Sequence, residues 1–201
     1  MVKIFSSREK QEVEQAVREA EKGTGAEIAV IVLPSSDHYI DFVLGYGIIC
    51  ADFVTLGLWT VGIYRHFVDL LVIQIAVLLA LFGIPFLRRA LWRLVPGRVL
   101  HRRSANRALV EYHKIHRRFA ATVPLVLLFV SLGERYTHVL ASHAVYEKIS
   151  DEKWDGVVAN FARTVSSHNI GKACVAAVSE IGVILGDVFP ADGKNPTPMN
   201  S

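Results

Sequence analysis

The chain has 201 residues, 52% of them apolar, a mean hydropathy of +0.35 and a formal net charge of +3. That apolar share is high for a soluble domain of this length, and two distant cysteines without a CxxC motif argue against a disulfide framework or a cysteine-based zinc site. The charge is uneven, because ten Lys/Arg and a single acid lie between Arg88 and Phe119.

The first predicted elements are a charged helix and a strand. Ser6 and Glu9 have the spacing of a capping box, and an apolar stripe continues at helical spacing to Gly23. No apolar signal-peptide core precedes this helix, so we expect the N-terminus to stay in the cytoplasm. Residues 27–34 (EIAVIVLP) form an almost continuous β-branched run, which predicts a central strand covered on both faces.

Two long apolar stretches follow. Residues 42–64 carry one charge, Asp52, and residues 70–87 carry none. A helix needs roughly 20 apolar residues to cross a bilayer, so both stretches qualify as transmembrane helices. The short link between them predicts an antiparallel hairpin. The alternative, a pair of buried core helices, would need more covering mass than a chain of this length supplies.

The arginines after the second stretch predict its orientation. Lys/Arg close to a membrane segment stay on the cytoplasmic side, so both termini are expected there, in a multi-pass protein of the bacterial inner membrane. We expect a membrane-surface site for anionic headgroups at six arginines: Arg88, Arg89, Arg93, Arg98, Arg102 and Arg103. A nucleic-acid surface is the alternative, but headgroups explain the position of these charges without nucleic acid.

Asp52 is the single charge of the first stretch. An acid inside a membrane segment suggests a functional site. Three interpretations stay open: a proton or ion relay, a helix contact within an oligomer, and a tolerated acid. The stretch expected at equal depth on the second helix, Leu78–Ala80, offers no polar partner, and Gln74 is expected nearer the far side.

The part after the hairpin predicts a helix near 105–119, strands near 125–131 and 136–141, and two amphipathic helices that begin near Asp151 and Ile170. Neither polar part buries a core alone. The economical interpretation is one α/β domain, residues 1–36 plus 98–190, interrupted by the hairpin. Residues 191–201 are expected to be a disordered tail.

Three motifs carry a resemblance: TGAEIAVIV (Thr24–Val32), VSLGER (Val130–Arg135) and WDGVV (Trp154–Val158). With the order of elements, they resemble the TPM domain family, in particular short bacterial members in which a transmembrane hairpin interrupts the domain. The resemblance implies a three-layer α/β/α fold with a small mixed sheet. It also implies phosphatase activity and, in some members, binding of a divalent ion.

The chemistry-bearing residues are few. Where relatives carry a GYG-type segment and an acidic turn, this chain has ASHAVYEKIS and SSHNIGKAC, which supply few oxygen ligands. Glu27, Asp151 and Asp155 are weak candidates for a metal site, and no catalytic residue is assigned. No phosphate loop, nucleophile elbow or HExxH motif is present.

We therefore interpret the chain as a non-enzymatic membrane protein. Its cytoplasmic domain would be a partner-binding or assembly module, with a membrane-protein partner or a second copy and no cofactor. The alternative is a membrane-bound phosphatase-like hydrolase that depends on a divalent metal gathered by Glu27, Asp151 and Asp155.

Overall fold

The structure is a computed structural model that describes residues 5–62, 67–83, 93–119, 123–167 and 169–191. Within these ranges the chain is a mixed α/β protein with seven helices and a three-stranded sheet. It divides into two compact units, Met1–Ser36 with His101–Ser201, and Asp37–Leu100. The expected tail lies outside the described residues from position 192 onward.

Helix α1 (Ser7–Lys22) leads into strand β1 (Glu27–Leu33). The predicted capping box is confirmed: the Glu9 N–H donates to Ser6 Oγ at 3.2 Å, and the Ser6 N–H donates to Glu9 Oε2 at 2.7 Å. The turn after α1 is fixed by Thr24, whose Oγ1 donates to the Phe189 carbonyl at 2.7 Å. The start of β1 is therefore tied to the C-terminal end of helix α8 (Ile170–Val188).

The sheet has the order β1-β2-β3, with β2 (Leu125–Ser131) parallel to β1 and antiparallel to β3 (Tyr136–Ala141). The expectation of a central β1 is wrong: β2 is central and buried throughout, whereas six of seven β1 residues are half-buried. A continuous apolar run indicates that both faces of a strand are covered. It does not indicate whether the strand has a hydrogen-bonded neighbour on one side or on both.

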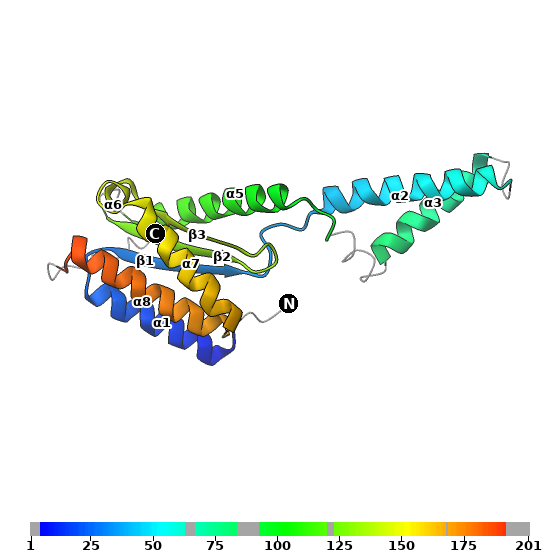
Figure 1. The fold of residues 1–201 in the computed structure, drawn as a ribbon. Coiled ribbons are helices and arrows are strands. Elements are labelled where there is room, and N and C mark those ends of the chain that lie inside the picture. The colour runs from blue at the N-terminus through cyan, green and yellow to red at the C-terminus, as the bar shows by residue number, and fades with distance from the viewer. Residues whose placement is uncertain (1–4, 63–66, 84–92, 120–122, 168, 192–201) are drawn as a thin grey trace. The chain divides into compact units, whose positions relative to one another are not determined.

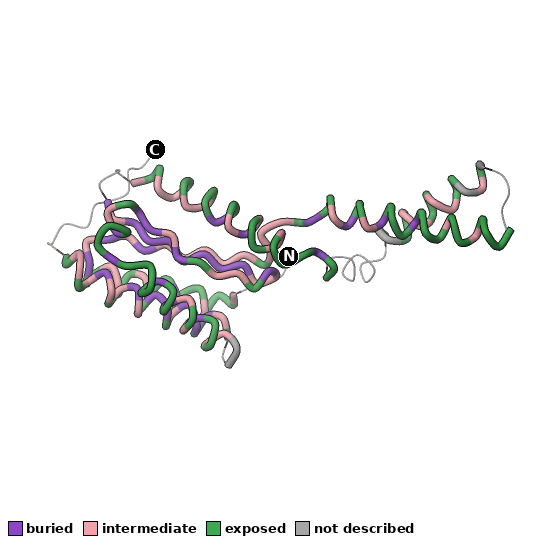
Figure 2. Tube along the Cα trace, turned by 45° about the horizontal axis from the view of Figure 1, so that its top comes forward, coloured by how far each residue is buried: buried purple, intermediate pink, exposed green. Residues whose placement is uncertain are grey.

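Helices lie against both faces of this sheet (Figures 1 and 2). Helix α5 (Gly97–His116) packs Ala108 onto Leu127 and Phe129 of β2. Helices α1, α7 (Asp151–Ser167) and α8 pack onto the other face and form the larger cluster, with the short helix α6 (His143–Tyr146) beside it. The apolar stripes of α7 and α8 face this cluster. Buried residues of the stripes are Trp154, Val157, Phe161, Cys174, Ala177, Val178, Ile181 and Leu185, and half-buried ones are Val158, Val165, Ile170 and Val188.

The second unit contains helices α2 (Ile40–Thr60) and α3 (Phe67–Gly83), which contact each other. Among the described residues, α2 alone is long and apolar enough to cross a membrane, and α3 has a shorter apolar stretch, Leu71–Ala80. Both helices begin earlier in the chain than the predicted stretches. The expected end of the second stretch, residues 84–87, lies outside the described residues.

Candidate functional site

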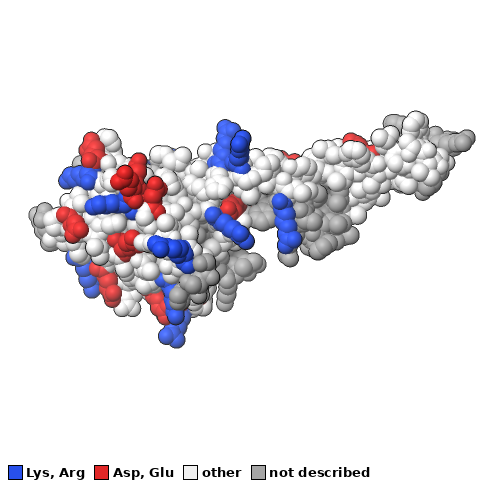
Figure 3. Space-filling model, in the orientation of Figure 1, with Lys and Arg blue, Asp and Glu red and all other residues white. Residues whose placement is uncertain are grey.

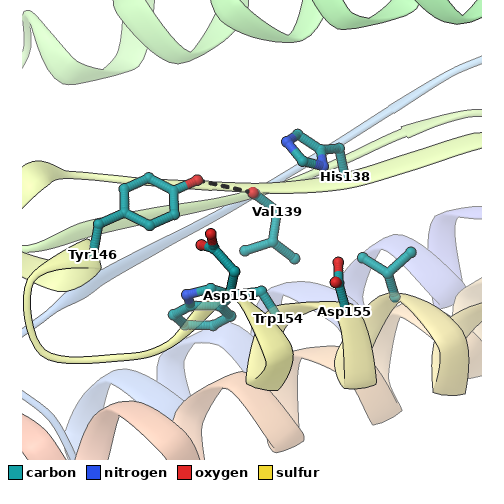
Figure 4. A pocket seen from close by; sticks show the side chains of 7 residues that line it. His138, Val139, Tyr146, Asp151, Trp154 and Asp155 are labelled. Atoms are coloured by element: carbon teal, nitrogen blue, oxygen red, sulfur yellow. Dashed lines mark hydrogen bonds between the residues drawn. The ribbon is translucent and has the colours of Figure 1, made fainter.

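A pocket of about 600 Å³ opens beside the outer edge of β3 (Figure 4). It is lined by His138 and Val139 from β3, Tyr146 from α6, and Asp151, Trp154 and Asp155 from α7. Asp151 and Asp155 are four residues apart, so the helix places them on one face. Figure 4 shows both carboxylates rising toward the strand, with the imidazole of His138 beyond it.

The electrostatics of this pocket centre on His138. Burial lowers the pKa of its imidazole, and the negative charges of Asp155 and then Asp151 act in the opposite direction. Burial also raises the pKa of the Tyr146 hydroxyl, which donates to the Val139 carbonyl at 3.4 Å. The pocket thus has two carboxylates on one side of the edge strand and a histidine of lowered pKa across it, and the carboxylates suit recognition of a hydrogen-bond donor.

Trp154 separates this pocket from the core. Its side chain is 4% exposed, and Nε1 finds no hydrogen-bond partner within the described residues. The first turn of α7 is thereby anchored by an aromatic ring rather than by a polar contact. Helical spacing points to Trp154 as a buried residue, whereas a lone histidine on a strand, such as His138, gives no periodic signal.

Glu27 lies elsewhere, at the beginning of β1. Its carboxyl hydrogen-bonds to that of Glu21, which also accepts the Ile28 N–H at 3.0 Å. Burial, then the charge of Glu21, raises the pKa of Glu27 to about 7, and burial raises the pKa of Glu21. The two carboxyls therefore share a proton near neutral pH. Glu27 is not among the residues that line the pocket of Asp151 and Asp155.

The described residues contain no group of three or more His, Cys, Asp or Glu side chains arranged to hold a metal ion. The histidine and two aspartates of the pocket are near neighbours without forming such a group. A hard cation needs several oxygen ligands at once, so two carboxylates on one helix turn are a weak site without ligands from a substrate.

A buried carboxylate that the sequence did not single out lies in the turn between β2 and β3. Glu134 is 5% exposed and accepts from Ser35 Oγ at 2.7 Å, from the Ser36 N–H at 3.0 Å and from Ser131 Oγ. Ser36 Oγ also donates to Ser131 Oγ at 2.8 Å. The VSLGER motif therefore holds the segment that leaves β1 against the end of β2.

The expected membrane-surface arginines are partly described. Arg93, Arg98 and Arg102 are exposed, and Arg103 is half-buried. Arg88 and Arg89 lie outside the described residues. Further along α5, Arg107 and Lys114 both pair with Glu111, at 2.9 and 3.0 Å, so part of the positive charge on this helix is neutralised locally.

Asp52 has a partner, contrary to expectation. Gln74 Nε2 on α3 donates to its Oδ1 at 2.8 Å. A shallow pocket beside it is lined by Asp52, Thr55, Leu56 and Trp59, and the Thr55 hydroxyl donates to the Ala51 carbonyl at 2.8 Å. The carboxylate therefore joins the two helices of the second unit.

No protein-family model and no curated protein sequence matches this chain. A similar fold occurs in the BA42 protein of the psychrophilic bacterium Bizionia argentinensis, whose structure was determined by NMR. The two structures align with a TM-score of 0.59 and 14% sequence identity, over 98% of this chain and 94% of the other. At this identity the likeness supports the fold alone.

Proposed function

We propose that the chain is an integral membrane protein whose α2–α3 hairpin crosses the bilayer and whose other unit binds a protein partner at the cytoplasmic surface. The observation that carries this proposal is the outward apolar surface of α2. Phe53 is 71% exposed and Trp59 57% exposed, along a helix of 21 residues. Contiguous apolar surface of this kind is stable in lipid and favours aggregation in water.

Helix α3 supports the crossing as a hairpin. Val68 and Leu79 are 67% and 68% exposed, and the helix contacts α2. The face drawn in Figure 3 shows few charged side chains over α2 and α3, whereas Lys, Arg, Asp and Glu are scattered over the other unit. The exposed Arg93, Arg98 and Arg102 would then contact anionic headgroups on the cytoplasmic side.

For the α/β unit we propose the three-layer arrangement of TPM domains. The clusters on the two faces of the sheet support it: α5 covers one face, and α1, α7 and α8 cover the other. We propose that this unit is a partner-binding or assembly module.

Membrane insertion is tested by expressing the full chain in a bacterium and extracting membranes with alkaline carbonate. We expect the protein to remain in the pellet. A reporter active only in the periplasm should be silent at the C-terminus and active in the link at residues 63–66. Release by carbonate, or activity of the C-terminal reporter, would contradict the proposed anchoring or orientation.

The pocket of His138, Asp151 and Asp155 favours a second candidate, a phosphatase-like hydrolase with a divalent ion. The discriminating measurement is phosphate release from p-nitrophenyl phosphate by detergent-purified protein with Mg²⁺ or Mn²⁺. The matched control for Asp151→Asn is Glu147→Gln, because Glu147 is exposed, pairs with His143 Nε2 at 3.1 Å and does not line the pocket. Turnover lost in the first variant and kept in the second would replace the binding-module proposal.

A further inference from the structure

Strand β1 presents an open backbone edge. The Glu27 N–H donates to the Pro124 carbonyl at 2.8 Å, and the Leu33 carbonyl accepts from the Leu132 N–H at 3.0 Å. The register pairs Glu27 with Leu125, so odd-numbered residues of β1 direct their backbone groups toward β2. Backbone groups alternate in direction along a strand, and those of Ile28, Val30 and Val32 therefore point away from the sheet.

This edge is limited at both ends. At the first end, the Ile28 N–H already donates to Glu21 Oε1 at 3.0 Å. At the other end, Pro34 has no N–H, and its carbonyl accepts from the Gly133 N–H at 2.9 Å. Between them, the described part of the chain offers no hydrogen-bond partner to the outward groups of Val30 and Val32. Unpaired groups of this kind are a template for another strand.

The opposite edge of the sheet is partly obstructed. The Val139 carbonyl of β3 accepts from the Tyr146 hydroxyl at 3.4 Å, and α6 and α7 surround the pocket beside it. Proteins usually protect an edge with charges, prolines or a covering element, because an apolar edge invites pairing. β1 carries no charged residue after Glu27 and remains half-buried along its length. β1 is therefore the more open of the two edges.

A groove of about 330 Å³ runs between this edge and α1. Its apolar lining comes from Val13 and Val17 of α1 and from Ile28 and Val30 of β1. The charged rim comes from Glu14 and Arg18, which pair at 3.9 Å on the exposed side of α1. A strand placed against β1 would therefore form backbone hydrogen bonds on one side and bury alternate apolar side chains against the helix.

We propose that an extended segment of a partner protein binds here as an additional strand on β1. Its backbone would pair with Val30 and Val32, and apolar side chains at every second position would enter the groove beside α1. Strand addition derives affinity from main-chain hydrogen bonds and specificity from the pocket that receives alternate side chains. This inference rests on the partner-binding part of the proposed function and gives it a surface.

A second copy of this chain is the competing occupant, and the position of α1 argues against it. Twofold pairing of two β1 strands would put both α1 helices on the same face of the joined sheet. Adjacent strands lie about 4.8 Å apart, whereas packed helices need about 8–10 Å between their axes. Because α1 lines the groove beside β1, twofold pairing would bring two such helices together, whereas a single extended segment brings no second helix.

The test uses the full chain in lipid nanodiscs and a fluorescent peptide of alternating valine and threonine with terminal lysines. Two variants of the peptide are N-methylated, the first at all of its valine amides and the second at all of its threonine amides. Only one set of amides can face β1 and donate hydrogen bonds to it. The peptide methylated on that set should therefore bind roughly tenfold more weakly, and the other should bind like the unmethylated parent. Hydrogen exchange of residues 28–33 should slow when the parent peptide is bound.

The protein side of the test compares Val17→Lys with Val183→Lys. Val17 lines the groove, and Val183 on α8 is 67% exposed and outside it. We expect the first variant to weaken binding at least several-fold and the second to leave it unchanged. Equal affinity of the two N-methylated peptides, or unchanged amide hydrogen exchange at residues 28–33 with millimolar parent peptide, would overturn the proposal. Slow exchange that depends on protein concentration without peptide would assign the edge to a second copy instead.

The two proposals fail separately. Carbonate release or metal-dependent turnover bears on membrane anchoring and on the binding-module assignment, and leaves the peptide result unaffected. If N-methylation of either set of amides leaves peptide affinity unchanged, the β1 edge is rejected as the binding surface, whatever the membrane experiments give.

Discussion

Gln74 on α3 donates a hydrogen bond of 2.8 Å to Asp52 on α2, and this contact joins the two helices through polar side chains on otherwise apolar surfaces. In lipid such bonds contribute on average about 0.6 kcal/mol, with a maximum near 1.7 kcal/mol. The contact gives Asp52 a role between two helices of the same chain, which differs from the predicted relay, oligomer contact and tolerated acid.

We expect Gln74→Leu to destabilise the pairing of α2 with α3, because it leaves the Asp52 carboxylate without its hydrogen-bond donor. Asp52→Leu combined with Gln74→Leu should recover part of the loss, since no polar group then remains. Unfolding of the single and double variants in detergent gives the coupling energy, expected at about 0.6–1.7 kcal/mol. A coupling energy of zero would mean that the two side chains act independently.

The stability of the α/β unit should depend on pH through Glu27. Its pKa in the folded chain is about 7, above the ordinary 4.5, because of burial and then the charge and hydrogen bond of Glu21. The stabilisation that the protonated carboxyl contributes is complete below about pH 4.5 and is lost as the pH rises through about 7.

Glu27→Gln keeps a hydrogen-bond donor and removes the charge, so it should stabilise the protein above pH 7 and flatten the pH dependence. The gain is on the order of 1 kcal/mol once solvent screening of a half-exposed carboxyl is considered. Urea unfolding at pH 5, 6, 7 and 8 measures it, with Glu19→Gln on the exposed face of α1 as control. If the free energy of unfolding of wild type and of Glu27→Gln changed with pH in parallel, Glu21 and Glu27 would not share a proton.

Glu134→Gln should destabilise the junction between β1 and β2. The carboxylate accepts from Ser35, Ser36 and Ser131, and an amide offers one acceptor oxygen and a donor group in its place. We expect a loss of about 1–3 kcal/mol in the free energy of unfolding. Glu147→Gln at an exposed site is the control, expected within about 0.5 kcal/mol of wild type.

Gly182→Ala should destabilise the contact between α1 and α8. A Cβ at Gly182 would lie 2.7 Å from the Cβ of Ala20 and 3.2 Å from its Cα, so the helices would have to separate. The cost is about 1–3 kcal/mol. Gly156→Ala on α7 meets nothing within 4 Å and should instead stabilise the helix by roughly 0.5–1 kcal/mol. Thermal unfolding of both variants distinguishes crowding from helix propensity.

Local patterns predicted the elements of the α/β unit well. The strands near 125–131 and 136–141 and the capping box at Ser6 are confirmed, because short apolar runs bounded by a turn, and cap spacing, depend on neighbouring residues alone. The position of β1 at the sheet edge was not predicted, because strand order depends on pairing between distant segments. A continuous apolar run is compatible with either place.

The partner of Asp52 was missed for a geometric reason. Depth along the hairpin was counted from apolar stretches ending at 64 and beginning at 70, whereas α2 ends at Thr60 and α3 begins at Phe67. Each of these two shifts brings the residue of α3 that lies level with Asp52 closer to Gln74. The carboxyl pair of Glu21 and Glu27 was likewise invisible, since a helix end and a strand start meet there only after folding.

The parallel pairing of β1 with β2 has a consequence for biosynthesis. Glu27 pairs with Leu125, and the whole connection through α2, α3 and α5 lies between them. At roughly 5–20 residues per second, about 100 residues take on the order of 5–20 s to synthesise, so β1 leaves the ribosome long before its neighbour exists. During this interval an apolar strand must be shielded by α1 or by a chaperone, and the proposed membrane hairpin would have time to enter the bilayer before the sheet closes.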